Sequence, residues 1–231
     1  MNVKILRLDR VFSTIIIALL ILINFQMIVP GEAGNSTVIT SLPYTITSPG
    51  VYVLESDLTS TGDGIIVLSA NVTILGKGYS ITGSGNSNGI NVSSVRGNVI
   101  IKDIIIRNFN TGIYIYDVYT DAYEFSGLVL ENIIVENSTY QGIYVKSVYY
   151  NGLLKNVKVI GGTSPTYTYG IYIDQAEGFT ILHTTVIGQN IGDYGIYIDN
   201  SYGVYIYDTH VERTHYESIY IEDNEYTTIV L

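Results

Sequence analysis

From residue 64 onward, one short pattern of hydrophobic and polar positions recurs along the chain: a small residue, isoleucine, any residue, and then isoleucine or valine. The seven copies lie at 64–67, 89–92, 112–115, 142–145, 170–173, 195–198 and 218–221. Successive copies begin 25, 23, 30, 28, 25 and 23 residues apart, and repeats of this length are typical of a solenoid. Because the apolar residues alternate with a period of two, each copy predicts a strand rather than a helix.

Two further apolar pairs follow in most repeats, for example Val99/Ile101 and Ile104/Ile106. Three short strands per repeat predict an all-β fold, a single-stranded right-handed parallel β-helix of about seven coils. Inward-facing aliphatic residues of successive coils are then expected to form ladders along the axis. Segment 34–60 lacks the tetrapeptide and is expected to cap the first coil, so the β-helix repeats are predicted over 61–231.

The first 33 residues have the features of an export signal. Three basic residues lie within 1–10, an apolar run covers 11–29, and Pro30 ends it before a small-x-small pattern at 31–33. This predicts a secretory signal peptide, with an uncleaved membrane anchor as the alternative. In both cases the rest of the chain is expected outside the cell or at its surface, with membrane contact through this segment alone.

The composition of the chain excludes some classes of function. The chain has 231 residues, a formal net charge of −10, only 11 lysines and arginines, and no cysteine. A protein with so few basic residues is not expected to bind nucleic acid, and disulfides and thiolate metal sites require cysteine. Four glycosylation tripeptides agree with an exported chain, and they begin at Asn35, Asn71, Asn91 and Asn137.

A further pattern lies within residues 49–115. It consists of 49–54, 57–58, 64–65, 71–74, Gly76, Gly78, Ile81, Gly83 and 89–90. This stretch resembles the NosD-like repeats of the class of carbohydrate-binding proteins and sugar hydrolases (CASH). The resemblance implies a parallel β-helix, and a role as a surface protein, as in many archaea, or as a lyase, hydrolase or accessory factor. The copper-delivery role of NosD itself is not expected, because copper favours Met and His ligands and both methionines lie within 1–33.

The third residue of the tetrapeptide, which faces outward, is a tyrosine in five successive repeats. These residues are Tyr114, Tyr144, Tyr172, Tyr197 and Tyr220. Stacked at the spacing of adjacent strands, they predict one aromatic strip that binds a polysaccharide, a surface glycan or a protein partner. The alternative is a structural role, because tyrosine is a favourable outward residue in strands.

Two residues beyond the tyrosines lies a row that ends in acids: Tyr116, Lys146, Asp174, Asp199 and Glu222. Solvated side chains at the strand ends are the simplest interpretation. The alternatives are a calcium site, since calcium prefers oxygen ligands, and a catalytic carboxylate pair at Asp174 and Asp199. The sequence contains no motif of polygalacturonases or pectate lyases, so we expect a binding protein without catalysis and no cofactor apart from calcium.

Two segments near the C-terminus complete the candidates. Residues 208–215 contain Asp208, His210, Glu212 and His215, which suggest a metal cluster, but the repeat register aligns Asp208 with His183 at a polar corner. Residues 225–231 begin a further strand whose apolar edge predicts end-to-end self-association. A binding rod, a degenerate polysaccharide lyase or hydrolase, and a self-assembling surface subunit are therefore the three hypotheses.

Overall fold

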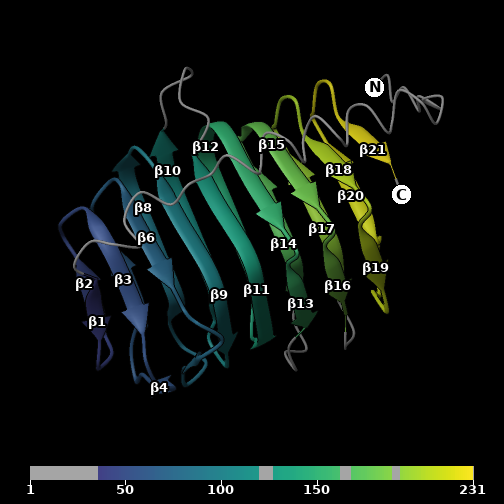
Figure 1. Cartoon of the computed structure of the whole chain (residues 1–231). Helices are drawn as coiled ribbons and strands as arrows, with labels where there is room; N and C mark the ends of the chain where they lie inside the picture. The colour runs from purple at the N-terminus through teal and green to yellow at the C-terminus, as the bar shows by residue number, and fades with distance from the viewer. Residues whose placement is uncertain (1–35, 120–126, 162–167, 189–192, 231) are drawn as a thin grey trace.

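The computed structural model describes residues 36–119, 127–161, 168–188 and 193–230. Within these ranges all regular structure is β, and every strand pairs in parallel with the strand one coil away. Coils stack along one axis, from β1 and β2 at one end to β20 and β21 at the other (Figure 1). The predicted parallel β-helix of about seven coils is confirmed.

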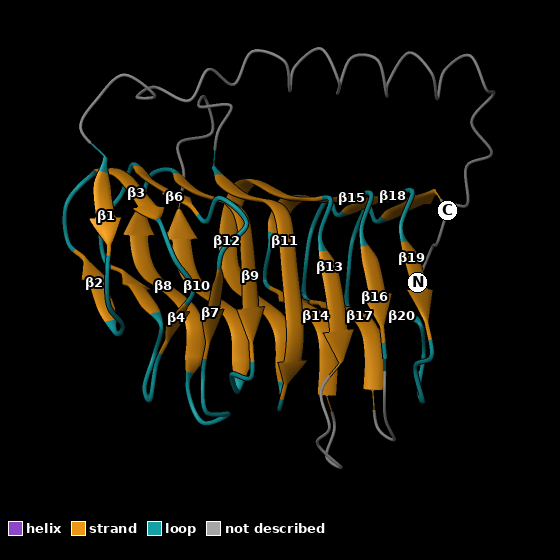
Figure 2. Ribbon diagram, turned by 60° about the horizontal axis from the view of Figure 1, so that its bottom comes forward, coloured by secondary structure: helices purple, strands orange, loops and turns teal. Residues whose placement is uncertain are grey.

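Each coil contributes strands to three faces, which run along the length of the rod (Figure 2). The first face contains β2 (Tyr44–Ile46), β5 (Ile65–Val67), β8 (Asn88–Arg96), β10 (Thr111–Tyr119), β12 (Gln141–Lys155), β14 (Thr168–Asp174), β17 (Asp193–Asp199) and β20 (Ile219–Glu222). The second face contains β1 (Thr37–Ile39), β3 (Gly50–Leu54), β6 (Val72–Leu75), the first parts of β9 (Val99–Arg107) and β11 (Leu128–Ser138), the end of β12, β15 (Glu177–Leu182), β18 (Tyr205–Tyr207) and β21 (Thr228–Val230). The third face contains β4 (Leu58–Thr59), β7 (Ser80–Thr82), the second parts of β9 and β11, β13 (Lys158–Gly161), β16 (Thr185–Ile187) and β19 (His210–Glu212).

The core consists of the inward-facing ladders that the tetrapeptide predicts. Its isoleucine position pairs in register from β5 to β20, and the residues are Ile65, Ile90, Ile113, Ile143, Ile171, Ile196 and Ile219. All but Ile219 are fully buried. Burying an aliphatic side chain of this size contributes roughly 1.5–3 kcal/mol, so these ladders hold the coils together without any disulfide.

Parallel pairing begins earlier than the tetrapeptide does. In β2, Tyr44 pairs with Ile65, and Ile46 pairs with Val67. Ile39 and Ile46 are each only 1% exposed. Segment 34–60 therefore contributes strands to all three faces in addition to covering the end of the first coil.

Polar residues in left-handed conformation form the corner between the second and third faces. Asp103, Asn132, Asn156, His183 and Asp208 all have φ between 42° and 55°, a region that asparagine and aspartate tolerate better than most residues. The Asn132 amide donates to Asp103 at 2.8 Å, and His183 Nδ1 lies 2.6 Å from an Asp208 oxygen. The predicted corner position of Asp208 and His183 is confirmed.

A column of glycines occupies the first position of the repeat. It contains Gly64, Gly89, Gly112, Gly142, Gly170 and Gly195. A Cβ at any of them would lie no more than 2.6 Å from the carbonyl oxygen of the equivalent residue one coil on. The seventh residue of the column is Ser218, against which no further coil lies in the described part of the chain. Glycine is thus required by coil stacking rather than by an unusual φ.

The described residues contain no helix that is long and apolar enough to span a membrane. The predicted signal or anchor segment, residues 1–33, lies outside them.

Replacing Gly142 with alanine is expected to destabilise the rod strongly. The added Cβ would meet Val159 and the Gly170 carbonyl, and overpacking against backbone costs about 3 kcal/mol or more. Gly62→Ala is the matched control, because no atom lies within 4 Å of a Cβ at Gly62. Urea unfolding checks this, and equal midpoints for the two variants would contradict the role assigned to the column.

Candidate functional site

The five predicted tyrosines lie in one row on the first face. Adjacent members of the row pair in register from β10 to β20. In chain order, the four distances between neighbouring ring centroids are 5.3, 5.3, 4.9 and 5.1 Å. Each ring is half-buried by its neighbours. The row is therefore continuous over five coils.

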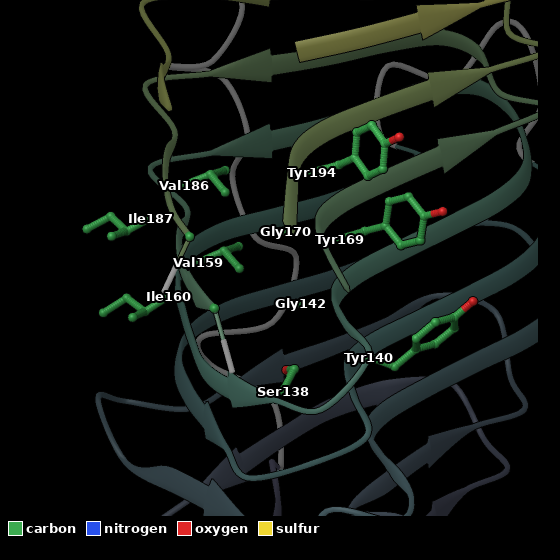
Figure 3. Close-up of a pocket in the computed structure, with 12 residues that line it drawn as sticks. Ser138, Tyr140, Gly142, Val159, Ile160, Tyr169, Gly170, Val186, Ile187 and Tyr194 are labelled. Atoms are coloured by element: carbon green, nitrogen blue, oxygen red, sulfur yellow. The ribbon is translucent and has the colours of Figure 1, made fainter. Parts of the chain in front are cut away.

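A second row of tyrosines, which the sequence analysis did not identify, runs beside the first. It contains Tyr140, Tyr169, Tyr194 and Tyr216. Tyr169 and Tyr194 stack with a centroid distance of 5.5 Å and an interplanar angle of 13°, and Tyr194 and Tyr216 with 5.0 Å and 19°. Figure 3 shows Tyr140, Tyr169 and Tyr194 one above another at the edge of the first face. The signal was a tyrosine one or two positions before the small residue of the tetrapeptide.

The two rows pack against each other and form one surface, the tyrosine face, made of these nine residues. The centroid of Tyr169 lies 4.9 Å from that of Tyr172, and the centroid of Tyr194 lies 5.4 Å from that of Tyr197. Nearly parallel rings at 5.0 Å cannot lie side by side in one plane, so Tyr194 and Tyr216 overlap in part. Much of the aromatic surface is thus buried against other rings of the tyrosine face. This packing agrees with the predicted structural role, and the exposed parts of the rings leave a binding role possible as well.

A shallow groove borders the second row on the side of the third face. Its walls include Tyr140, Tyr169, Val159 and Val186, and Ser138 lies at its base (Figure 3). Ser138 Oγ is buried and has no hydrogen-bond partner. Residues 162–167 and 189–192 follow directly after residues of this groove and lie outside the described residues, so we assign no function to the groove.

The acidic row lies beside the first tyrosine row, in the predicted register: Lys146 pairs with Asp174, Asp174 with Asp199, and Asp199 with Glu222. The Lys146 ammonium lies 2.6 Å from Asp174 Oδ2. Asp174 is only 5% exposed. Its second oxygen, Oδ1, is buried and has no hydrogen-bond partner. Asp174 is therefore not the solvated strand-end residue that the simplest interpretation expected.

Burial and like charges shift the pKa values of residues in and beside this row. Burial raises the pKa of Asp199, and the neighbouring Asp174 carboxylate raises it further. Burial also raises the pKa of Tyr172, with Asp174 and Asp199 adding to the effect. The Tyr197 hydroxyl donates a hydrogen bond to Glu222 Oε2 at 2.7 Å. Negative charge in the row is thus only partly neutralised.

The alternative metal sites find no support among the described residues. Within those residues, no group of three or more His, Asp or Glu side chains lies in an arrangement that could hold a metal ion. At the predicted calcium site, Lys146 already binds Asp174 and Tyr197 already binds Glu222. In segment 208–215, His210 lies 3.5 Å from Glu212, and the His215 ring packs against Tyr216.

The glycosylation tripeptides fall in different environments. Asn71 and Asn137 are exposed and lie at left-handed corners. Asn91 lies within β8, where its amide donates to Asp63 at 3.3 Å and its carbonyl accepts from Ser93 at 2.7 Å. Asn35 lies outside the described residues. The corner positions Asn71 and Asn137 are the accessible acceptors among the three that are described.

The last described coil leaves its ladder residues half-buried. These residues are Val211, Ile219, Ile221 and Ile229, whereas the same ladders are fully buried in the preceding coils. End-to-end association through this edge stays a prediction.

Asp199→Asn is expected to stabilise the chain near pH 7. Because the folded state raises the pKa of Asp199 above its ordinary value, it binds the proton more readily than the unfolded state does. The stability of the original chain therefore falls as the pH rises above about 4 and passes through the folded pKa. Thermal unfolding between acid and neutral pH checks this. The advantage of the variant should vanish at acid pH, and a variant less stable than the original chain at pH 7 would contradict the assignment.

Comparison with known proteins agrees with the geometry. Residues 120–231 match the family model described as the right handed beta helix region. No curated protein matches the chain, and no solved structure matches it. Family match and strand register together show a right-handed parallel β-helix protein.

Proposed function

We propose that this protein is a non-catalytic, extracellular or cell-surface rod, and that a linear polysaccharide lies along its tyrosine face. The observation that carries the proposal is the continuous pair of tyrosine rows, in register over successive coils. A solenoid presents the same group at every coil. A polymer with a regular repeat can contact such a surface at many equivalent points.

The chemistry of tyrosine suits this ligand class. Each side chain combines an apolar ring with a polar hydroxyl, and a sugar chain combines apolar C–H surface with hydroxyl groups. Mutual ring packing holds the side chains in place, so little side-chain freedom remains to be lost when a ligand binds. This preorganisation supports a binding role.

Surface exposure of the rod is part of the same proposal. It is supported by the export-signal pattern in residues 1–33 and by the position of two glycosylation tripeptides at exposed corners. The alternative lyase or hydrolase would use Asp174 and Asp199. A catalytic carboxylate pair needs both groups free to act as acid, base or nucleophile, whereas Asp174 forms an ion pair with Lys146, which favours binding over catalysis.

Removing two central rings is expected to weaken polysaccharide binding. The full chain and a Tyr172→Ala/Tyr197→Ala variant are compared by pull-down on a panel of insoluble polysaccharides and by glycan array. Aromatic contacts are worth roughly 0.5–1.5 kcal/mol each, so the loss of two rings should weaken binding by about tenfold. Tyr79→Ala, which removes a 37% exposed tyrosine outside the tyrosine face, should bind normally.

Two results would count against this proposal. One is a folded original chain, with a cooperative thermal transition, that binds no polysaccharide. The other is binding that the double variant retains. A Tyr172→Phe/Tyr197→Phe variant separates the two parts of the side chain, because it keeps the rings and loses the hydroxyl that binds Glu222.

A second candidate function is a subunit that assembles end to end, and it rests on the half-buried ladder residues of the last described coil. Sedimentation velocity should then show association that grows with protein concentration. Ile229→Glu should keep the chain monomeric, because a charge at this edge opposes strand pairing with a second molecule. A chain that is monomeric at all concentrations would contradict this function.

A further inference from the structure

We propose that the tyrosine face binds a protonated amine at Asp174 and Asp199, and that the polysaccharide it takes is an amino-sugar polymer. This proposal rests on the function proposed above and names its ligand class. The relevant part of the molecule is the acidic row, which follows the first tyrosine row along β12, β14, β17 and β20.

The chain itself shows how an ammonium group fits at this place. Lys146 lies two residues after Tyr144 and therefore on the same side of β12. Its ammonium lies 2.6 Å from Asp174 Oδ2, and the Lys146 side chain is 32% exposed, whereas Asp174 is only 5% exposed. This contact is a charge-assisted hydrogen bond, which is stronger than a hydrogen bond between neutral groups.

One coil further along, the corresponding partner is missing. Asp174 Oδ1 is buried and has no hydrogen-bond partner. Lys146 comes from the coil before Asp174 and holds Oδ2, whereas Asp199 comes from the coil after it. We infer that Oδ1 is the oxygen on the Asp199 side. A buried carboxylate oxygen without a donor is costly, and a donor from a ligand would remove that cost.

The charged groups around this position leave negative charge in excess. The carboxylates are Asp174 on β14, Asp199 on β17 and Glu222 on β20, and Lys146 on β12 is the cation that faces Asp174. The hydroxyls of Tyr172 and Tyr197 are neutral, because their pKa values are raised above the ordinary value. Burial and the neighbouring Asp174 carboxylate raise the pKa of Asp199, and hydrogen bonds from Asn200 offset this only in part. Glu222 already accepts a hydrogen bond from the Tyr197 hydroxyl. The place for a further cationic donor therefore lies between Asp174 and Asp199.

An ammonium suits the position between Asp174 and Asp199 better than a metal ion does. It offers three N–H donors and needs no further ligands, whereas calcium takes about six to eight oxygen ligands. The described residues provide no group of three acidic or histidine side chains for a metal. On an amino sugar, the ring can lie over the tyrosines while its amine reaches the carboxylates. The formal net charge of −10 also attracts a polycation.

The experiment compares two oligosaccharides that differ at the amino group of each sugar, which is free in one and acetylated in the other. The full chain is titrated by calorimetry with a β-linked glucosamine oligomer and with an N-acetylglucosamine oligomer of the same length. At about pH 6 the free amine is protonated, and acetylation removes its charge. We expect the glucosamine oligomer to bind at least about tenfold more tightly. Asp199→Asn should lose this difference, whereas Glu55→Gln should keep it, because the Glu55 side chain is 61% exposed and its ion pair with Lys77 is long, at 3.9 Å.

The outcomes separate this inference from the function on which it rests. Equal affinity for both oligomers, unchanged in Asp199→Asn, would overturn the amine site and leave polysaccharide binding intact. Calcium that raises the melting temperature of the original chain but not of Asp199→Asn would overturn it in favour of a metal site. A lysine-rich peptide that binds where neither oligomer does would overturn the amino-sugar assignment. A folded chain that binds no glycan of any kind would overturn the proposed function itself.

Discussion

Close stacking of each coil on the next, in register, is the constraint on which the rest of this structure depends. Parallel strands bring equivalent residues of neighbouring coils to the same distance on every face. Inside, this distance produces the isoleucine and valine ladders. Outside, it produces the tyrosine rows and the line of Lys146, Asp174 and Asp199. Core, aromatic surface and charge pattern are thus three results of one repeat distance, and a change of register would alter them together.

Several features could be predicted from the sequence because the repeat length determines register. The tetrapeptide identified the inward ladder from Ile65 to Ile219, and alignment placed His183 beside Asp208 at a corner. The second tyrosine row was missed because Tyr140 and Tyr216 stand two positions before the repeat, whereas Tyr169 and Tyr194 stand one position before it. The buried state of Asp174 could not be predicted either, since alignment gives neighbours and not the depth of a side chain.

The tyrosine face combines rigidity with unbalanced charge. Rings packed at 4.9–5.5 Å in two rows leave the side chains few alternative rotamers. The carboxylates beside them have one lysine, Lys146, at one end of the row and none at the three positions that follow it in register. A surface of this kind has a direction along the rod, because its two ends differ in charge while its shape repeats.

The glycine column also bears on how a rod of this kind can change length. At Gly142 or Gly170 the backbone is already adapted to a coil pressed against it, so a duplicated coil inserted there meets a compatible neighbour. A coil stacked directly on Ser218 would meet a Cβ and a hydroxyl and could approach less closely than at a glycine. Duplication and recombination are therefore expected to insert coils beside the glycine positions more readily than beside Ser218.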